Sequence, residues 1–302
     1  MRNKSLFMVA SLLLLTACVP TQQTAAPTRI VYDREGVGVS VPASTDTIVS
    51  IGPAISEVLV AFGFADNIIA ADTFSSDILG YGAQATLDMM ALDVEYIISL
   101  APDAVIISNV VRIGGEDPLA ALGQAGIDVV YVPASETIAE IVADISFLAD
   151  LLNREAEGAA ILSQMQDYLD EVRALAQGLP PRSVYLEIGA APHMFSLGQG
   201  TFLHELVEIA GGQNIFAEQS GWLPVADEAV IAANPDVIIT NVSYLPDPIS
   251  EITSRPGWEN ITAIQNNNVF QIDTDYSSRP SHGITRALRE IAQAIHPDVF
   301  ME

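Results

Sequence analysis

Short apolar runs alternate with amphipathic segments along most of this chain of 302 residues. The apolar runs of the first half have the length and residue types of buried strands. They cover residues 47–51, 68–71, 104–108 and 129–132, with helical patterns at 56–62 and 118–125. Strands that alternate with helices predict a parallel α/β sheet.

A stretch from residue 137 to residue 177 separates this region from a second one like it. The stretch contains no proline and one glycine, and it predicts two consecutive helices that divide near Asn153. The second helix is expected to run from about residue 154 to 177, before Pro180 and Pro181. Beyond it, strands are predicted at 183–188, 237–241 and 269–272, and helices at 201–210, 228–233 and 283–294.

The fold class predicted by these elements is α/β, with two lobes that each contain a central, mainly parallel sheet and are joined by one long helix. The chain is 50% hydrophobic, which is enough for each lobe to bury its own core. The expected division is a lipoprotein signal peptide at 1–17, a flexible tether at 18–28, a first lobe at 29–152, an inter-lobe helix at 153–180 and a second lobe at 181–302.

One short pattern occurs once in each predicted lobe. A glutamate stands eight residues before the aspartate of a Pro-Asp pair, as Glu95 before Asp103 and as Glu228 before Asp236. Each copy predicts a helix that ends at Pro-Asp and leads into a buried strand. Any helix–turn–strand unit would explain the Pro-Asp pairs, but not two glutamates in the same register. The two lobes are therefore expected to be related.

The first eighteen residues have the pattern of a lipoprotein signal peptide. Arg2 and Lys4 precede an apolar run over residues 6–15, which closes in Leu-Thr-Ala-Cys at residues 15–18. A membrane-spanning helix is the alternative, but about ten apolar residues are half of the roughly 20 that such a helix needs. Cys18, the only cysteine, is therefore predicted to be lipidated and to anchor the mature chain to the cell membrane, on its periplasmic or outer face.

Charge and motif content exclude several classes of function. Cleavage before Cys18 removes Arg2 and Lys4, the only lysine, and leaves 10 of the 12 basic residues against 38 acidic ones. A phosphate-loop lysine and a Schiff-base lysine are then impossible, and nucleic acid is a poor partner for so acidic a chain. Acidic residues near His193 are the best candidates for an acid–base pair, but no catalytic motif supports an enzyme.

Several stretches together carry a family resemblance. They are residues 47–59, the two Glu…Pro-Asp units, and residues 221–225, 256–261 and 268–270. In these stretches the chain resembles the periplasmic-binding-protein family that serves importers of iron-siderophores, haem and cobalamin, the class with a rigid inter-lobe helix. The resemblance implies a monomeric binding protein without a cofactor of its own, with an ABC permease and its ATPase as partners.

The resemblance also implies a role for the two repeated glutamates. In such proteins a glutamate on each lobe is understood to dock against arginine pockets of the permease, and the matching residues here are Glu95 and Glu228. Two carboxylates held apart by a stiff helix suit charge-assisted bonds to arginine. For either one alone, an ordinary solvated helix charge is the alternative.

The loops that follow the predicted strands give the candidate ligand site, because ligands of open α/β lobes bind beyond the carboxyl ends of the strands. The candidates are Pro53, Phe74, Arg112, His193, Phe195, Trp222, Tyr244, Tyr276 and Arg279. Trp222 lies between Gly221 and Pro224, which favours a loop aromatic that binds over one packed in the core. For Phe195 the core stays an alternative, and for Arg112 and Arg279 a solvated surface position does.

Direct coordination of a metal ion is not the expected mode of binding. His193, Tyr244 and Tyr276 are conceivable metal ligands and Met194 a conceivable haem axial ligand, but a lone loop histidine is more often an ordinary polar residue. The remaining histidines do not form the cluster that bare zinc or manganese needs. The metal is therefore expected to arrive already chelated.

The predicted function is capture of a metal chelate between the lobes and its delivery to an ABC permease. Anionic catecholate siderophores favour a strongly basic cleft, so the scarcity of arginine favours hydroxamate-type iron complexes, haem or cobalamin. Iron complexes rank first and cobalamin second. A sensory lipoprotein with the same fold stays open, because a fold does not determine a function.

Overall fold

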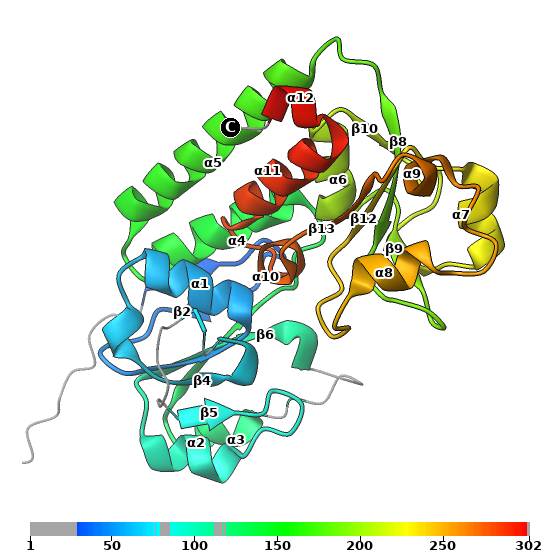
Figure 1. The fold of residues 1–302 in the computed structure, drawn as a ribbon. Coiled ribbons are helices and arrows are strands. Elements are labelled where there is room, and N and C mark those ends of the chain that lie inside the picture. Colours follow the sequence, from blue (N-terminus) through cyan, green and yellow to red (C-terminus); the bar gives the residue numbers. More distant parts are fainter. Residues whose placement is uncertain (1–28, 76, 79–84, 112–116, 118, 301–302) are drawn as a thin grey trace, which may run out of the picture.

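The computed structural model describes residues 29–75, 77–78, 85–111, 117 and 119–300, and Figure 1 shows how its elements are arranged. The expected signal peptide, the whole expected tether with Cys18, and Arg112 lie outside the described residues. One parallel sheet lies at the lower left of Figure 1 and a second at the upper right, with helices packed between them. This is the predicted fold class.

The first sheet has five parallel strands in the order β5-β4-β3-β6-β7. They are β3 (Ile48–Ile51), β4 (Ile68–Asp72), β5 (Ala85–Leu87), β6 (Ala104–Ser108) and β7 (Asp128–Val132). All four residues of β3 are buried, as are the first four of β6. Helices on both faces explain why these strands are continuous apolar runs and not alternating ones.

The second sheet has four parallel strands in the order β10-β8-β12-β13. They are β8 (Arg182–Glu187), β10 (Gly212–Asn214), β12 (Val237–Thr240) and β13 (Val269–Gln271). Its order matches that of β4-β3-β6-β7 in the first sheet, so four strands of each lobe follow the same spatial order relative to their order along the chain. The expected relation between the lobes is visible in this topology.

Twelve α-helices surround the sheets within the described residues. They are α1 (Pro53–Ala61), α2 (Val94–Leu100), α3 (Ala120–Gln124), α4 (Ile138–Leu151), α5 (Glu155–Ala176), α6 (Phe202–Ile209), α7 (Asp227–Ala233), α8 (Pro248–Thr253), α9 (Thr262–Gln265), α10 (Thr274–Ser278), α11 (Ile284–Ile295) and α12 (Pro297–Phe300). The predicted long helix is α5, whose 22 residues span about 33 Å. The expected break before it is at Asn153, whose φ of 53° ends the helical path of α4.

Helix α5 is packed against both lobes by one continuous apolar core. Its Leu169 and Val172 belong to the same buried cluster as Leu59 of α1 and Val184 of β8. The helix therefore acts as a stiff connection and not as a free linker. Helix α4 precedes it with a capping box in which Thr137 and Glu140 satisfy each other's backbone N–H groups.

The repeated Glu…Pro-Asp pattern has the same structure in both lobes. Helices α2 and α7 are both seven residues long and both end in a left-handed residue, Ala101 and Asn234. The aspartate that follows then accepts from the backbone N–H at the start of the neighbouring strand. Asp103 bonds Thr47 N at 3.0 Å, and Asp236 bonds Ser183 N at 2.9 Å.

Two small antiparallel pairs were not predicted. They are β1 (Ile30–Tyr32) with β2 (Gly38–Ser40), and β9 (Phe195–Leu197) with β11 (Trp222–Pro224). Each strand has three residues, too few for an alternation of apolar and polar positions to be read. Over the described part of the chain, the helices are all too short or too polar to span a bilayer.

Candidate ligand-binding site between the lobes

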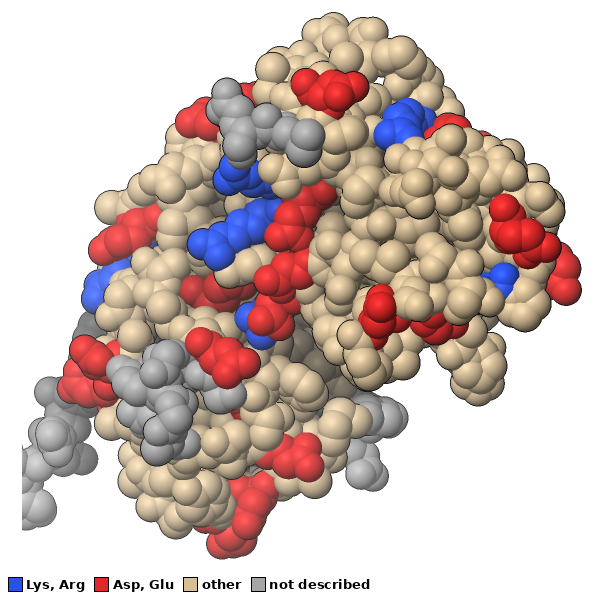
Figure 2. Space-filling view, in the orientation of Figure 1, with Lys and Arg blue, Asp and Glu red and all other residues tan. Residues whose placement is uncertain are grey.

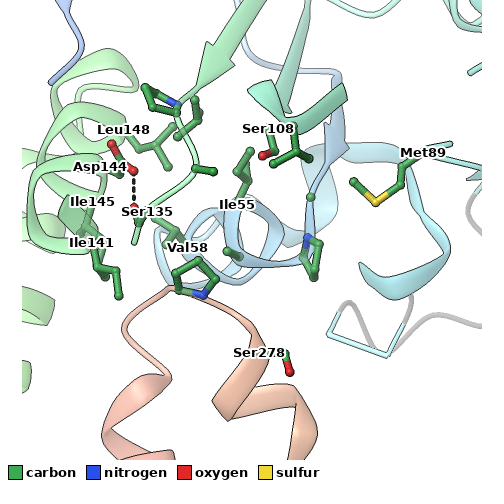
Figure 3. A pocket seen from close by; sticks show the side chains of 18 residues that line it. Ile55, Val58, Met89, Ser108, Ser135, Ile141, Asp144, Ile145, Leu148 and Ser278 are labelled. Atoms are coloured by element: carbon green, nitrogen blue, oxygen red, sulfur yellow. Dashed lines mark hydrogen bonds between the residues drawn. The ribbon is translucent and has the colours of Figure 1, made fainter. Parts of the chain in front are cut away.

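The carboxyl ends of β3, β6 and β7 open onto a cavity of about 230 Å³. Figure 3 shows its wall of aliphatic side chains from α1 and α4, and Ser278 of the second lobe completes the lining from below. The lining residues are Gly52, Pro53, Ala54, Ile55, Val58, Met89, Ser108, Val110, Val132, Pro133, Ala134, Ser135, Ile141, Asp144, Ile145, Leu148, Ser278 and Pro280. The cavity lies beyond the carboxyl ends of the strands, which is where a ligand was expected to bind.

A second cavity of about 310 Å³ adjoins the first on the side of the second lobe. It lies at the ends of β8 and β12 and is lined by Ser135, Ile188, Phe202, Leu203, Trp222, Asn241, Ser277, Ser278 and Pro280. Ser135, Ser278 and Pro280 line both cavities. The two are parts of one inter-lobe cleft, whose combined volume of about 540 Å³ falls in the range of small-molecule sites.

The turn from β3 into α1 brings backbone close to the cleft. Gly52 has a φ of 126°, and a Cβ at this position would lie 3.3 Å from Cβ of Ser108 on β6. Its N–H donates to Asp72 Oδ2 at 2.8 Å, and Pro53 then occupies the first turn of α1. Glycine permits this approach and proline favours the start of the helix.

The charged group in the cavity wall is Asp144 of α4, which is 7% exposed. Its Oδ2 accepts from Ser135 Oγ at 2.5 Å and from Arg34 Nη1 at 2.8 Å, whereas Oδ1 has no partner among the described residues. Burial raises the pKa of Asp144 to about 6, although Ser135 and Arg34 act in the opposite direction. The wall is thus apolar with one acidic group whose ion pair is already made.

Trp222 reaches across the cleft from β11. It is 38% exposed and lies edge-on to Phe202 with ring centroids 6.0 Å apart. Its Nε1–H donates to Glu136 Oε2 at 2.6 Å, and Glu136 belongs to the loop between β7 and α4. An exposed indole face bordering the cleft is a suitable stacking surface for a planar ligand.

Other predicted residues lie at the contact between the lobes. Arg279 is buried, pairs with Asp275 at 2.8 Å and donates to the backbone oxygen of Phe74 at 3.2 Å. The ring of Phe74 is 61% exposed. Pro53 and Trp222 are thus brought to the cleft wall, and Arg279 and Phe74 join the lobes beside it.

The remaining aromatic and sulfur-containing candidates are dispersed. Phe195, His193 and Tyr244 are exposed in the second lobe and do not line either cavity, and the Tyr244 hydroxyl accepts from the Ala190 N–H at 2.8 Å. Tyr276 points elsewhere, because its ring lies under Arg286 and its hydroxyl accepts from that guanidinium. Met194 is buried, and its sulfur contacts Arg255 at 3.1 Å, so it is not placed to ligate haem.

Sequence reasoning missed Ser135 and Asp144 in the cleft wall. Ser135 follows β7, so the rule of strand ends applied to that strand would have found it. The signal for Asp144 is an acidic residue among Ile141, Ile145 and Leu148 on one apolar helix face. Within the described ranges, no group of three or more His, Cys, Asp or Glu side chains is placed to hold a metal ion.

Glu95 and Glu228 lie away from the cavities, one on each lobe. Each is the second residue of its helix, α2 or α7, and each side chain is exposed. The negative charge of a carboxylate is favourable at the first turn of a helix. Both glutamates are therefore accessible in equivalent positions of the two lobes.

Comparison with known proteins defines the class. The sequence profile of the family described as periplasmic binding protein matches residues 48–276, and the chain belongs to this family. It is a family of solute-binding proteins and not of enzymes. The protein is an extracytoplasmic substrate-binding protein of the kind that serves ABC transporters.

Particular relatives cover most of the chain. The uncharacterized ABC transporter substrate-binding lipoprotein YvrC of Bacillus subtilis is 26% identical over 273 residues, 89% of this chain and 86% of its own. The cobalamin-binding protein of Halobacterium salinarum is 26% identical over 280 residues, 87% of this chain and 73% of its own. The crystal structure of a possible iron-binding (periplasmic solute-binding) protein from Staphylococcus epidermidis has a TM-score of 0.73 and 25% identity, over 83% of this chain and 98% of that one.

Proposed function

We propose that this protein captures a neutral, amide-bearing metal chelate in the inter-lobe cleft and delivers it to an ABC permease. The observation that carries the proposal is the charge of the cleft. Arg34 and Arg279 are the guanidinium groups beside it among the described residues, and Asp144 and Asp275 already neutralise them. An anionic ligand would have to compete with these carboxylates for its counter-charge.

The uncharged polar groups of the cleft suit amide ligands. Ser135, Ser278 and Asn241 contribute hydroxyl and amide groups to the cleft wall. Ser135 already donates to Asp144, and the Asn241 amide donates to Ser277 and Ser278, but the oxygen atoms of these side chains can still accept from the amide N–H groups of a ligand. Cobalamins and ferric hydroxamates present amide or hydroxamate groups around a metal centre, whereas haem and ferric catecholates carry negative charge. The cleft therefore favours cobalamins and ferric hydroxamates over haem and ferric catecholates.

Cobalamin is the first candidate within the neutral class. Sequence reasoning alone places iron complexes first, but the cleft charges are equally suited to cobalamin, and the Halobacterium salinarum relative is a cobalamin-binding protein. The exposed indole of Trp222 provides a surface on which the edge of a corrin ring or a nucleotide base can stack. Ferric hydroxamates are the second candidate.

A ligand panel tests the proposal. Protein freed of ligand by unfolding and refolding is titrated with cyanocobalamin, a ferric hydroxamate, haem and a ferric catecholate, and binding is followed by calorimetry and visible absorption. We expect a neutral chelate to bind at least about tenfold more tightly than either anionic one, which is a difference of about 1.4 kcal/mol. Tightest binding of haem or of the catecholate would contradict the proposal.

A lipid anchor and a permease contact complete the proposed mechanism. The Leu-Thr-Ala-Cys motif at residues 15–18 supports lipidation of Cys18, and the Bacillus subtilis relative is a lipoprotein. Replacement of Cys18 by Ala should abolish metabolic labelling with a fatty acid and leave ligand affinity unchanged. Normal labelling of the variant would show that Cys18 is not the lipid anchor.

Glu95 and Glu228 are the proposed contacts with the permease, one from each lobe.

A further inference from the structure

A groove of about 320 Å³ lies between α5 and α11, apart from the inter-lobe cleft. It is lined by Ile161, Gln164, Met165, Tyr168, His282, Thr285, Arg286 and Arg289. Figure 2 shows basic side chains gathered over this part of the surface, among the acidic groups that dominate elsewhere. A cluster of basic side chains is unusual in a chain whose formal net charge is −26.

The basic side chains come from one helix and face polar groups of the other. Arg286 and Arg289 are separated by one turn of α11, and His282 comes just before that helix begins. Gln164 and Tyr168 are likewise one turn apart on α5. Guanidinium, amide and hydroxyl groups from two helices thus line one groove, and all of them can donate hydrogen bonds.

These two arginines differ from most others in having no acidic partner. Six of the nine arginines in the described ranges pair with a carboxylate within 4.0 Å. Arg286 and Arg289 have no such pair with any described residue, although both are exposed and acidic residues outnumber basic ones threefold. A surface that leaves two adjacent guanidinium groups without carboxylates is suited to an external anion.

Part of the groove is held in place before any ligand arrives. Arg286 lies over the ring of Tyr276 at 4.6 Å from its centroid and donates to the tyrosine hydroxyl. Nδ1 of His282 is buried and has no hydrogen-bond partner among the described residues. A guanidinium already fixed by stacking loses less conformational entropy when it binds an oxyanion.

We propose that the groove between α5 and α11 is a second binding site, which takes a small oxyanion bearing a phosphate or carboxylate group. Arg286 and Arg289 hold the anion by charge-assisted hydrogen bonds, and Tyr168 and Gln164 close it from α5. Met165 and Ile161 form an apolar floor. The site is separate from the inter-lobe cleft, so the identity of the chelate bound there does not affect the proposal.

The test uses the mature chain with inorganic phosphate and citrate as probes. Calorimetry and thermal unfolding are measured with each probe against chloride at the same ionic strength, because a ligand that binds the native state raises its melting temperature. Phosphate or citrate should bind the wild type and stabilise it. Loss of one charge-assisted bond in Arg289→Ala or Arg286→Ala should weaken binding by about tenfold or more.

The matched control is Arg173→Ala, an exposed arginine of α5 that pairs with Asp170 outside the groove. This variant should bind the probes as the wild type does, and circular dichroism should show all variants folded. Vesicles of phosphatidylglycerol test a lipid headgroup as the source of the phosphate. Binding of vesicles that depends on Arg289 would assign the same chemistry to a headgroup. No response to either probe or to vesicles, or equal responses of Arg289→Ala and the wild type, would overturn the proposal.

Discussion

Asp144 should make the stability of this protein fall as pH rises through the mildly acidic range. It is buried in the cleft wall, where burial raises its pKa from 3.8 to about 6 against the opposing effects of Ser135 and Arg34. The carboxylates of Glu140 and Asp33 raise it further. Well below pH 3.8 the group is protonated in both the folded and the unfolded chain. Between pH 4 and 6 the folded chain keeps a proton that the unfolded chain has lost.

The size of the effect follows from that difference in pKa. One pKa unit corresponds to 1.36 kcal/mol, so about two units correspond to roughly 3 kcal/mol of stability lost between pH 4 and pH 7. Asn at this position keeps the shape and an acceptor oxygen but does not titrate. Asp144→Asn should therefore lack this loss, and should be the more stable protein at pH 7 if the bonds to Ser135 and Arg34 are retained.

Urea unfolding of both proteins at several pH values from 4 to 8 measures the effect. Other titrating groups are present in both chains, so the difference between the two free energies of unfolding isolates Asp144. We expect the wild type to lose roughly 3 kcal/mol relative to the variant as pH rises from 4 to 7. A difference that stays constant over this range would refute the reasoning.

Two further predictions concern the cleft and the core of the second lobe. Trp222→Ala should weaken chelate binding by about 1–3 kcal/mol, because it removes the aromatic surface beside the cleft; an unchanged dissociation constant would contradict the stacking role. Arg255→Ala should lower the free energy of unfolding by about 3–5 kcal/mol, since it leaves Glu187, now 2.7 Å from Arg255, buried without its partner. Arg173→Ala, which removes an exposed arginine, should change it by less than about 0.5 kcal/mol, and equal losses in the two variants would contradict this reasoning.

Much of the fold could be predicted because its signals are local. Strands β3, β6 and β12 are short, largely buried and mainly apolar runs, and α5 is a long stretch without proline. The repeated Pro-Asp units could also be recognised from the sequence alone. Asp103 and Asp236 each bind the start of the neighbouring strand, which gives the Pro-Asp pair the same structural role in both lobes.

The cleft was less predictable because its lining depends on how the two lobes meet. Pro53 follows from the end of β3 and Trp222 from its flanking Gly221 and Pro224, although Trp222 lies in the short strand β11 and not in a loop. The contact of Arg279 with Phe74, in contrast, requires the two lobes to be assembled. Tyr276 was expected near the ligand, yet Arg286, one element further along the chain, holds its ring. No pattern of a single strand or helix contains that contact.

Transport by a variant that lacks both Glu95 and Glu228 tests the importer account most directly. A strain without the wild-type gene is complemented with Glu95→Ala/Glu228→Ala, and ligand uptake is measured beside ligand binding by the same purified protein. As a control, Glu155→Ala/Glu259→Ala removes two other exposed carboxylates. Truncating one side of an interfacial charge pair costs about 2–5 kcal/mol, so the double variant should lose nearly all uptake while its ligand affinity stays unchanged. Each single variant should lose less, and the control should transport normally. Full uptake by the Glu95/Glu228 double variant would contradict the account.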